Sequence, residues 1–240
     1  MLTKLLNSFG YDVVPKADRR PFPLDFTNDE IAVCRRVKPF TMTDDVQLAC
    51  LIRAVEHVVR FNVPGQIVEC GVWKGGSMMA AALTLRRLGD LRQLYLYDTY
   101  EGFPAGSEVD RNWKGESAAV RRQQEGPGWG LARLDEVQAA IQSTGYDQKR
   151  CHYVKGMVEQ TIPKTAPDSI ALLRLDTDFY ASTLHELNHL YPLLSPGGVL
   201  IIDDYGGWEG ARKATDEFLE TLPHPVFLNR VNDSCRLVVK

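Results

Sequence analysis

Short apolar runs alternate with amphipathic stretches along most of the chain. The apolar runs occupy residues 66–71, 94–98, 151–154, 170–176 and 198–203. Stretches with near-helical spacing of apolar residues lie between or after them, at 43–62, 77–88, 131–143, 180–194 and 209–221. Strands that alternate with helices predict an α/β fold with a mostly parallel sheet. Two further extended stretches, 225–229 and 235–239, predict a final hairpin at the edge of that sheet.

Two segments stand outside this pattern. Residues 1–40 contain four prolines and predict an N-terminal arm before a domain at 41–240. Residues 102–130 hold six glycines and many charges, without the period of a core-forming element. A loop of this length in a compact domain is usually functional or disordered. We therefore expect a lid insertion beside the site, with a plain disordered insertion as the alternative.

Composition and charge exclude several classes of protein. Apolar residues make up 44% and charged residues 25% of the 240 positions, which is typical of a globular protein and not of a disordered chain. The net charge is −3 and the basic clusters are short, so no nucleic-acid partner is expected. Five cysteines without a C-x-x-C pair argue against a disulfide framework and against a cysteine zinc site.

Membrane and export signals are not evident in the sequence. No apolar run approaches the roughly 18 residues of a membrane span. The first residues, Met1 to Asn7, lack the apolar region of a signal peptide. The sequence therefore predicts a reduced, cytoplasmic protein without a membrane partner.

The first candidate site is a glycine-rich turn that follows a predicted strand and opens a predicted helix. It reads Glu69-Cys70-Gly71-Val72-Trp73-Lys74-Gly75-Gly76-Ser77. Glycines here allow a tight turn and let a ligand lie close to the backbone. Asp98 ends the next predicted strand, where a carboxylate can accept both hydrogen bonds of a ribose diol. The turn and Asp98 predict a site for a nucleoside-containing cofactor, with a purely structural junction as the alternative.

Two cofactors compete for this turn. The dinucleotide fingerprint G-x-G-x-x-G would need glycine at 71, 73 and 76, and position 73 is Trp. Glu69, just before the turn, is more typical of sites for S-adenosylmethionine, which has no pyrophosphate to place on a helix N-terminus. The sequence therefore favours S-adenosylmethionine. A nicotinamide-dependent Rossmann oxidoreductase remains the rival class.

Acidic residues close two further strands of the predicted sheet. Asp176 and Asp178 end one strand, and Asp203 and Asp204 end the next. Ligands of open parallel sheets bind at the carboxyl ends of the strands, where both pairs are expected. Clustered carboxylates repel one another unless they are protonated or bind a cation. The cluster predicts a divalent metal, Mg²⁺ above all, and the alternative is that these residues simply cap the following helices.

One zinc motif is treated as a chance match. His185-Glu186-Leu187-Asn188-His189 has the H-E-x-x-H pattern of helical zinc sites in metalloproteases. The helix that carries it is expected to pack along the flank of the sheet, away from the strand ends. No third ligand is evident, and both histidines are expected to be solvated.

The residues taken together resemble a known family, the macrocin O-methyltransferase (TylF-like) family of class I S-adenosylmethionine-dependent methyltransferases. The resemblance begins near Phe40 and covers over four-fifths of the chain. It is carried by the stretches already quoted and by others in the same order, Phe40-Thr41-Met42-Thr43, Tyr97-Asp98-Thr99-Tyr100-Glu101-Gly102-Phe103-Pro104, Val154-Lys155-Gly156, residues 174–183 and residues 194–206. Each piece occurs in other methyltransferases, but their joint order is specific.

The resemblance implies a fold and a cofactor site. The fold would be a Rossmann-like sheet of seven mostly parallel strands, with an antiparallel edge hairpin and helices on both faces. S-adenosylmethionine would be held through its ribose at Asp98 and pass close to the backbone at Gly71. Further cofactor-site residues, some from the turn and some from the resemblance alone, are Thr41, Met42, Glu69, Gly75, Ser77, Phe103 and Gly156.

The resemblance also implies a reaction. Mg²⁺ would bind Asp176, Asp203 and Asp204, and Asp178 would be the general base. The acceptor would be a hydroxyl on the sugar of a glycosylated natural product. A catechol-type small-molecule O-methyltransferase is the closest alternative, because two adjacent oxygens on Mg²⁺ suit a catechol as well as a sugar diol. The catalytic residues of the implied reaction would be Asp176 and Asp178, and water is the alternative base.

A homo-oligomer, most simply a dimer, is expected from the arm and the first long helix. Residues 1–40 and the helix at 43–62 need a surface on which to pack. Packing of that helix on its own sheet is the alternative.

Overall fold

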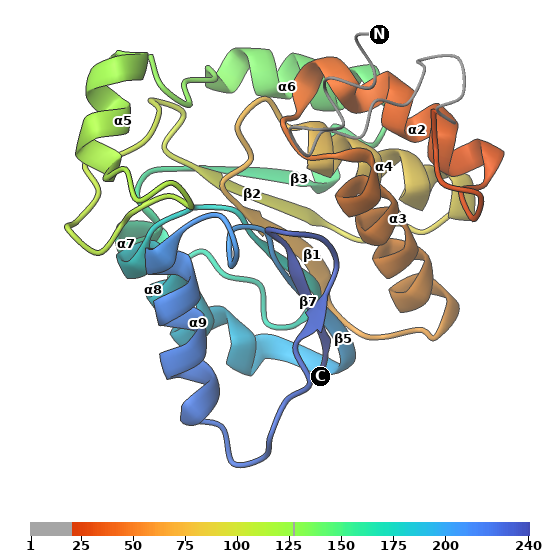
Figure 1. The fold of residues 1–240 in the computed structure, drawn as a ribbon. Coiled ribbons are helices and arrows are strands. Elements are labelled where there is room, and N and C mark those ends of the chain that lie inside the picture. The colour runs from red at the N-terminus through yellow and green to blue at the C-terminus, as the bar shows by residue number, and fades with distance from the viewer. Residues whose placement is uncertain (1–20, 127) are drawn as a thin grey trace, which may run out of the picture.

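The computed structural model describes residues 21–126 and 128–240. Its centre is a seven-stranded sheet with the order β3-β2-β1-β4-β5-β7-β6. Figure 1 shows this sheet in the middle of the molecule. Five neighbouring strands are parallel, and β7 and β6 join them as an antiparallel edge hairpin. The predicted Rossmann-like architecture is therefore confirmed. The strands are β1 Gln66–Cys70, β2 Leu94–Asp98, β3 Cys151–Lys155, β4 Ile170–Leu175, β5 Leu194–Ile202, β6 Asn229–Arg230 and β7 Arg236–Val239.

Helices cover both faces of this sheet (Figure 1). They are α2 Asn28–Val37, α3 Asp45–Arg60, α4 Gly76–Leu88, α5 Ala118–Glu125, α6 Leu134–Ser143, α7 Val158–Thr161, α8 Tyr180–Leu190 and α9 Glu209–Glu220. Alternate strand residues point to opposite faces, so each strand feeds two cores. Ile67 belongs to the core with α2, α3, α4 and α6, whereas Val68 belongs to the core with α7, α8 and α9.

The boundaries differ from the sequence prediction at several ends. The first long helix begins at Asp45 because the Asp44 side chain accepts the Gln47 N–H, and Thr43 is not its cap. The predicted helix at 180–194 ends at Leu190 and continues as a short 3-10 turn with Pro192. The fifth strand begins at Leu194, four residues earlier than predicted, and carries a register shift against β4.

The arm at 1–40 is more ordered than predicted over its described part. Residues 28–37 form α2, which begins with a Thr27 capping box. This helix packs on α3 and α4, and Glu30 receives hydrogen bonds from Arg53 of α3. The helix predicted at 43–62 is therefore covered by its own chain, and the reason given for a dimer does not hold. The dimer itself stays a prediction, and residues 1–20 lie outside the described part.

The segment at 102–130 is also more regular than its sequence pattern indicates. It contains α5, whose N-terminus is capped by Ser117. Residues 111 and 117 form an antiparallel bridge, and residue 112 bridges to Trp208 near the start of α9. The segment therefore packs over the carboxyl end of the sheet, where a lid would lie.

The strand order reverses at β1, beside the glycine turn. The chain runs from β1 to β2 and β3 on one side of β1, and β4 and β5 follow on its other side. Gly71 has φ +84°, and a Cβ there would lie 2.0 Å from the backbone oxygen of Asp176. Glycine is thus required by the contact between the β1 and β4 ends, in addition to any role beside a ligand.

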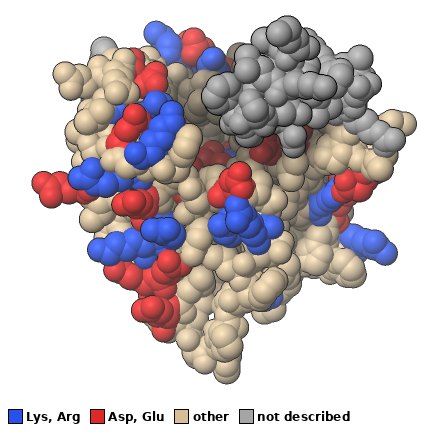
Figure 2. All heavy atoms as spheres, in the orientation of Figure 1, with Lys and Arg blue, Asp and Glu red and all other residues tan. Residues whose placement is uncertain are grey.

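The surface charges and the lengths of the helices can be described directly. On the face of the described residues in Figure 2, basic and acidic side chains are interspersed and form no continuous basic area. Among the helices of the described chain, none combines the length and apolar character needed to span a membrane.

Candidate active site

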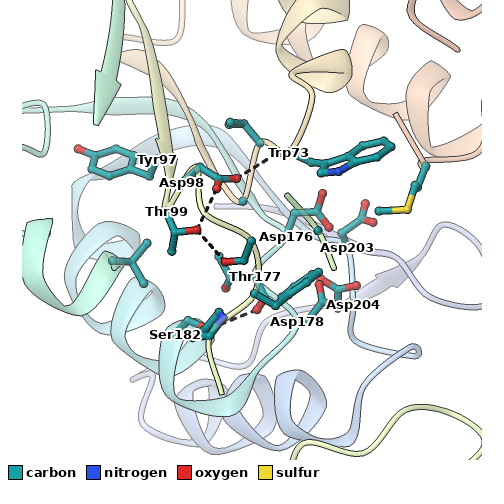
Figure 3. Close-up of a pocket in the computed structure, with 18 of the residues that line it drawn as sticks. Trp73, Tyr97, Asp98, Thr99, Asp176, Thr177, Asp178, Ser182, Asp203 and Asp204 are labelled. Carbon is teal, nitrogen blue, oxygen red and sulfur yellow. Dashed lines mark hydrogen bonds between the residues drawn. The ribbon is translucent and has the colours of Figure 1, made fainter. Parts of the chain in front are cut away.

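A cavity of about 340 Å³ opens at the carboxyl ends of β1, β2, β4 and β5. The glycine turn and Asp98 line one side, and the acidic strand ends line the other. Figure 3 shows the four aspartates 176, 178, 203 and 204 gathered opposite Asp98. The two sites that the sequence predicted separately therefore share one cavity.

Seven of the nine predicted cofactor residues line this cavity, namely Thr41, Met42, Gly71, Ser77, Asp98, Phe103 and Gly156. Glu69 and Gly75 do not. Glu69 is 1% exposed and pairs with Arg174 behind the turn. Gly75 adopts a left-handed conformation at the N-cap of α4, and a Cβ at this position would point toward the side chain of Val137. These two residues order the turn from outside the cavity.

Asp98 is held by the backbone of two loops. Its Oδ2 accepts the N–H of Trp73 at 2.9 Å, and its Oδ1 accepts the N–H of Tyr100 at 2.8 Å. Burial raises the pKa of Asp98, and these hydrogen bonds oppose that rise. Trp73 and Tyr100 both have positive φ, so the loops bend sharply around the carboxylate. The carboxylate is fixed at the carboxyl end of β2, where the sequence predicted a contact with the ribose.

Three carboxylates converge on the other side of the cavity. Oxygen atoms of Asp176, Asp178 and Asp204 lie within 4.8 Å of one another, which makes them a candidate cation group. The Oδ2 atom of Asp204 is buried without a hydrogen-bond partner. Burial, followed by the charges of neighbouring aspartates, raises the pKa values of Asp178 and Asp204. The group therefore carries unsatisfied acceptors that a cation or a proton would satisfy.

Asp203 lies beside this group and is tied to Arg174. Its Oδ1 accepts hydrogen bonds from Arg174 at 2.6 Å and from Gln47 at 3.1 Å. Burial raises the pKa of Asp203, and the charge of Arg174 opposes the rise. Both hydrogen bonds fall on Oδ1, so Oδ2 stays available to a ligand in the cavity.

Arg174 is a functional residue that the sequence prediction missed. It is 2% exposed inside a strand whose six residues are all buried. Its guanidinium contacts Glu69, Asp176 and Asp203, and donates to the Thr43 hydroxyl at 3.1 Å. Burial alone would lower the pKa of Arg174, but the three carboxylates raise it well above its usual value. The signal was present in the sequence as a lone arginine within an apolar strand.

Asp178 does not cap α8, which removes one alternative for this residue. The N-cap position of α8 is Phe179, which makes no side-chain cap bond. The first N–H of the helix, at Tyr180, instead donates to Asp110 at 2.8 Å. Asp178 itself has φ +65°, an uncommon conformation for a residue with a side chain. Such conformations concentrate at functional sites.

Aromatic side chains form a second wall that the sequence prediction did not identify. Phe103 packs on Trp129 at 4.5 Å between ring centroids, and Phe179 meets Trp208 edge-on at 5.3 Å. Trp129 and Trp208 lie 6.2 Å apart and line the same cavity as Asp178. Three separate segments supply these rings, so no local sequence pattern could reveal the wall.

The H-E-x-x-H motif lies away from the cavity, as expected, but its histidines are half-buried and not fully solvated. His185 Nε2 bonds the carbonyl oxygen of Ile162, and His189 Nδ1 bonds that of His185. Glu186 is fully buried and accepts from the Thr177 hydroxyl. The motif therefore packs the helix against the sheet.

Comparison with known proteins decides the family. The macrocin-O-methyltransferase (TylF) family model matches residues 19–235. The chain belongs to this family. It is an O-methyltransferase, as the names of its relatives also state.

Two curated relatives and one solved structure illustrate the similarity. The chain is 34% identical over 204 residues to 8-demethyl-8-(2,3-dimethoxy-alpha-L-rhamnosyl)-tetracenomycin-C 4'-O-methyltransferase of Streptomyces olivaceus, covering 83% of this chain and 72% of the relative. It is 31% identical over 182 residues to demethyldecarbamoylnovobiocin O-methyltransferase of Streptomyces niveus, covering 74% and 67%. The structure of the O-methyltransferase NovP matches with a TM-score of 0.76 and 28% identity, covering 84% of this chain and 82% of that one.

Replacement of Arg174 by methionine should destabilise this O-methyltransferase strongly. The change leaves Glu69 and Asp203 buried, and Asp176 partly buried, without their common cation, and loss of one partner of a buried ion pair costs about 3–5 kcal/mol. The control is Arg133→Met, which breaks an ion pair whose side chains are 69% and 70% exposed. Guanidinium unfolding should show a loss under about 1 kcal/mol for the control. An equally small loss for Arg174→Met would contradict the assigned role.

Proposed function

We propose that this O-methyltransferase moves the methyl group of S-adenosylmethionine, with Mg²⁺, to a hydroxyl on the sugar of a glycosylated natural product. The observation that carries the proposal is the single cavity that holds Asp98 and the glycine turn on one side and the acidic cluster on the other. The names of the two curated relatives support the acceptor class, since one names a rhamnosyl compound and both act on natural products.

The start of α4 favours S-adenosylmethionine over a dinucleotide. A Cβ at Gly76 would lie 2.6 Å from the backbone oxygen of Phe40 and 2.6 Å from the Cβ of Thr41. The chain at 40–41 therefore packs against the first turn of this helix. A dinucleotide would need that space for its pyrophosphate, whereas S-adenosylmethionine has none. Asp98 is in place to accept the ribose hydroxyls.

The acidic cluster fits a divalent cation. Hard cations prefer carboxylate oxygens, and the cavity offers several in contact with one arginine. We assign Asp176, Asp203 and Asp204 as ligands, because Arg174 occupies only one oxygen of Asp176 and one of Asp203. The buried Oδ2 of Asp204, which lacks a partner, would supply the third. When bound, Mg²⁺ stabilises negative charge on a coordinated hydroxyl oxygen.

Asp178 is the proposed general base. S-adenosylmethionine supplies an electrophilic methyl group, and its sulfonium becomes a thioether on transfer. The acceptor hydroxyl loses its proton as the new C–O bond forms, so a group beside it must accept that proton. Asp178 lies next to Asp176 and Asp204 and, unlike Asp176 and Asp203, is not bonded to Arg174. With Asp204 assigned to the metal, the Asp178 carboxylate is left to accept the proton.

The aromatic wall is the proposed sugar contact. Trp129 and Trp208 line the cavity beside Asp178, and their apolar faces can pack on the C–H face of a sugar ring. In this binding mode the sugar ring packs on Trp129 and Trp208, and one of its hydroxyls must reach Asp178. A catechol is the competing small acceptor, and the relatives' names do not favour it.

The function is tested by following methyl transfer directly. The protein is incubated with methyl-labelled S-adenosylmethionine, Mg²⁺ and one of three acceptors, 8-demethyl-8-(2,3-dimethoxy-α-L-rhamnosyl)-tetracenomycin C, demethyldecarbamoylnovobiocin or catechol. Label should appear on a glycoside and be lost with EDTA. Calorimetry should show binding of S-adenosylhomocysteine and none of NAD. Tight NAD binding without a response to S-adenosylhomocysteine would end the proposal, and transfer to catechol alone would replace the acceptor class.

Replacement of Asp178 by asparagine should lower turnover and spare binding. Asparagine tolerates the left-handed backbone at this position, so the loop should keep its shape. The variant lacks the proton acceptor, and general-base help is worth about 10²–10⁴ in rate. We expect kcat to fall by roughly that factor, while S-adenosylhomocysteine affinity by calorimetry stays within about twofold. Near-normal turnover with saturating Mg²⁺ would leave water as the base.

A further inference from the structure

Asp110 is a buried carboxylate that the proposed mechanism does not use. It lies in the segment at 102–130 and is 1% exposed. Its Oδ2 accepts the backbone N–H and the hydroxyl of Ser107, each at 2.6 Å. Its Oδ1 accepts the backbone N–H of Tyr180 at 2.8 Å, from a residue 70 positions later. One side chain therefore joins the segment over the cavity to the start of α8.

The start of α8 depends on this contact, because the helix has no cap of its own. A carboxylate at a helix N-terminus satisfies an otherwise unpaired N–H and interacts favourably with the helix dipole. Asp110 fills the role that a Ser, Thr or Asp at position 179 would normally fill. Position 179 is Phe, whose ring belongs to the aromatic wall.

The same segment also contacts the loop that follows Asp203 and Asp204. Residues 111–113 join residues 207–209 through an antiparallel bridge and two backbone hydrogen bonds, of 2.8 and 2.9 Å. A Cβ at Gly210 would lie 2.0 Å from Asp110 Oδ1 and 2.9 Å from the Tyr180 nitrogen. Position 210 has no room for a side chain, so three chain segments meet at the Asp110 carboxylate.

Asp178 stands two residues before this junction and has a strained backbone. Its φ is +65°, and the N–H of Phe179 bonds back to the Thr177 oxygen at 2.7 Å across it. A left-handed residue with a side chain persists where the surrounding structure fixes it. The fixed points are Thr177, which bonds Glu186, and Tyr180, which bonds Asp110.

We propose that Asp110 is a positioning residue for methyl transfer. By holding the Tyr180 N–H, it keeps the turn at Asp178 closed, so that the Asp178 carboxylate stays beside Asp204 and faces the acceptor. Asp110 acts through Asp178 and touches neither cofactor nor acceptor. The inference rests on the proposed function, because it gives Asp178 the part of the base.

The experiment compares the full-length wild-type protein with Asp110→Ala, Asp110→Asn and a control, Asp147→Ala. Asparagine keeps one oxygen, which can accept the Tyr180 N–H, but it loses the oxygen that accepts the Ser107 N–H. Alanine loses both acceptors. Asp147 also caps a short helix, accepting the Lys149 N–H at 3.0 Å, but it does not line the cavity. The control therefore removes a capping aspartate that is exposed and acts only locally.

Kinetics are measured with whichever of the two glycosides named above is methylated faster. A displacement of about 1 Å at a catalytic group can cost on the order of 10²-fold, so Asp110→Ala should lower kcat about 10- to 100-fold. The acceptor KM and the S-adenosylhomocysteine affinity should stay within about twofold, because their contacts are elsewhere. Asp110→Asn should retain clearly more kcat than Asp110→Ala, because its remaining oxygen can still accept the Tyr180 N–H. Asp147→Ala should match the wild type.

Hydrogen exchange by mass spectrometry supplies a readout without an acceptor. Asp110→Ala should speed exchange in residues 178–183, and Asp110→Asn and Asp147→Ala should not. Two kinetic results would overturn the inference: an Asp110→Ala variant with the kcat of the wild type, or an Asp110→Asn variant with a kcat as low as that of Asp110→Ala. A loss of S-adenosylhomocysteine affinity in Asp110→Ala that matches the loss of kcat would also overturn it, as would an Asp110→Ala chain that does not fold. If the wild type methylates no acceptor, the proposed function fails, and exchange still decides whether Asp110 holds the Asp178 turn.

Discussion

The cavity depends on one buried cation that joins three strand ends. Arg174 contacts Glu69 near the end of β1, Asp176 just beyond its own strand β4, and Asp203 just beyond β5. One positive charge therefore faces three carboxylates, which can be held together but not neutralised. Because Arg174 binds one oxygen each of Asp176 and Asp203, it also sets which oxygens remain for the cavity. The excess negative charge of the group is the physical reason to assign a divalent cation there.

This arrangement divides the cavity into two halves with different chemistry. Backbone N–H groups fix Asp98 beside the glycine turn, and nothing cationic is in direct contact with it among the described residues. The opposite half gathers acidic side chains under a wall of aromatic rings. A nucleoside with a sulfonium fits the first half, and a hydroxyl on a sugar ring fits the second. The chain at 102–130 lines the same cavity and contacts both the loop before α9 and the start of α8.

The sheet, the strand ends and the family could be predicted from sequence because they depend on local patterns. An apolar run that ends in Asp marks a strand and places its carboxylate at the carboxyl end. The contacts of Arg174 with Glu69 and Asp203, and of Asp110 with Tyr180, could not be predicted, because they join different strands or segments 70 residues apart. The order of residues 102–130 also depends on tertiary contacts with the α9 loop. The expected lack of cover on α3 was wrong because α2 lies within residues assigned to the arm.

The most direct measurement of the central claim is a crystal structure of the protein with S-adenosylhomocysteine and Mn²⁺, with anomalous data collected at the manganese edge. The account predicts the ribose hydroxyls on Asp98 and one Mn²⁺ peak in the same cavity, bound by Asp176, Asp203 and Asp204. Asp178 should lie beside the metal, on the side of the aromatic wall. Bound S-adenosylhomocysteine without a Mn²⁺ peak at the aspartates, or with the ribose away from Asp98, would contradict it.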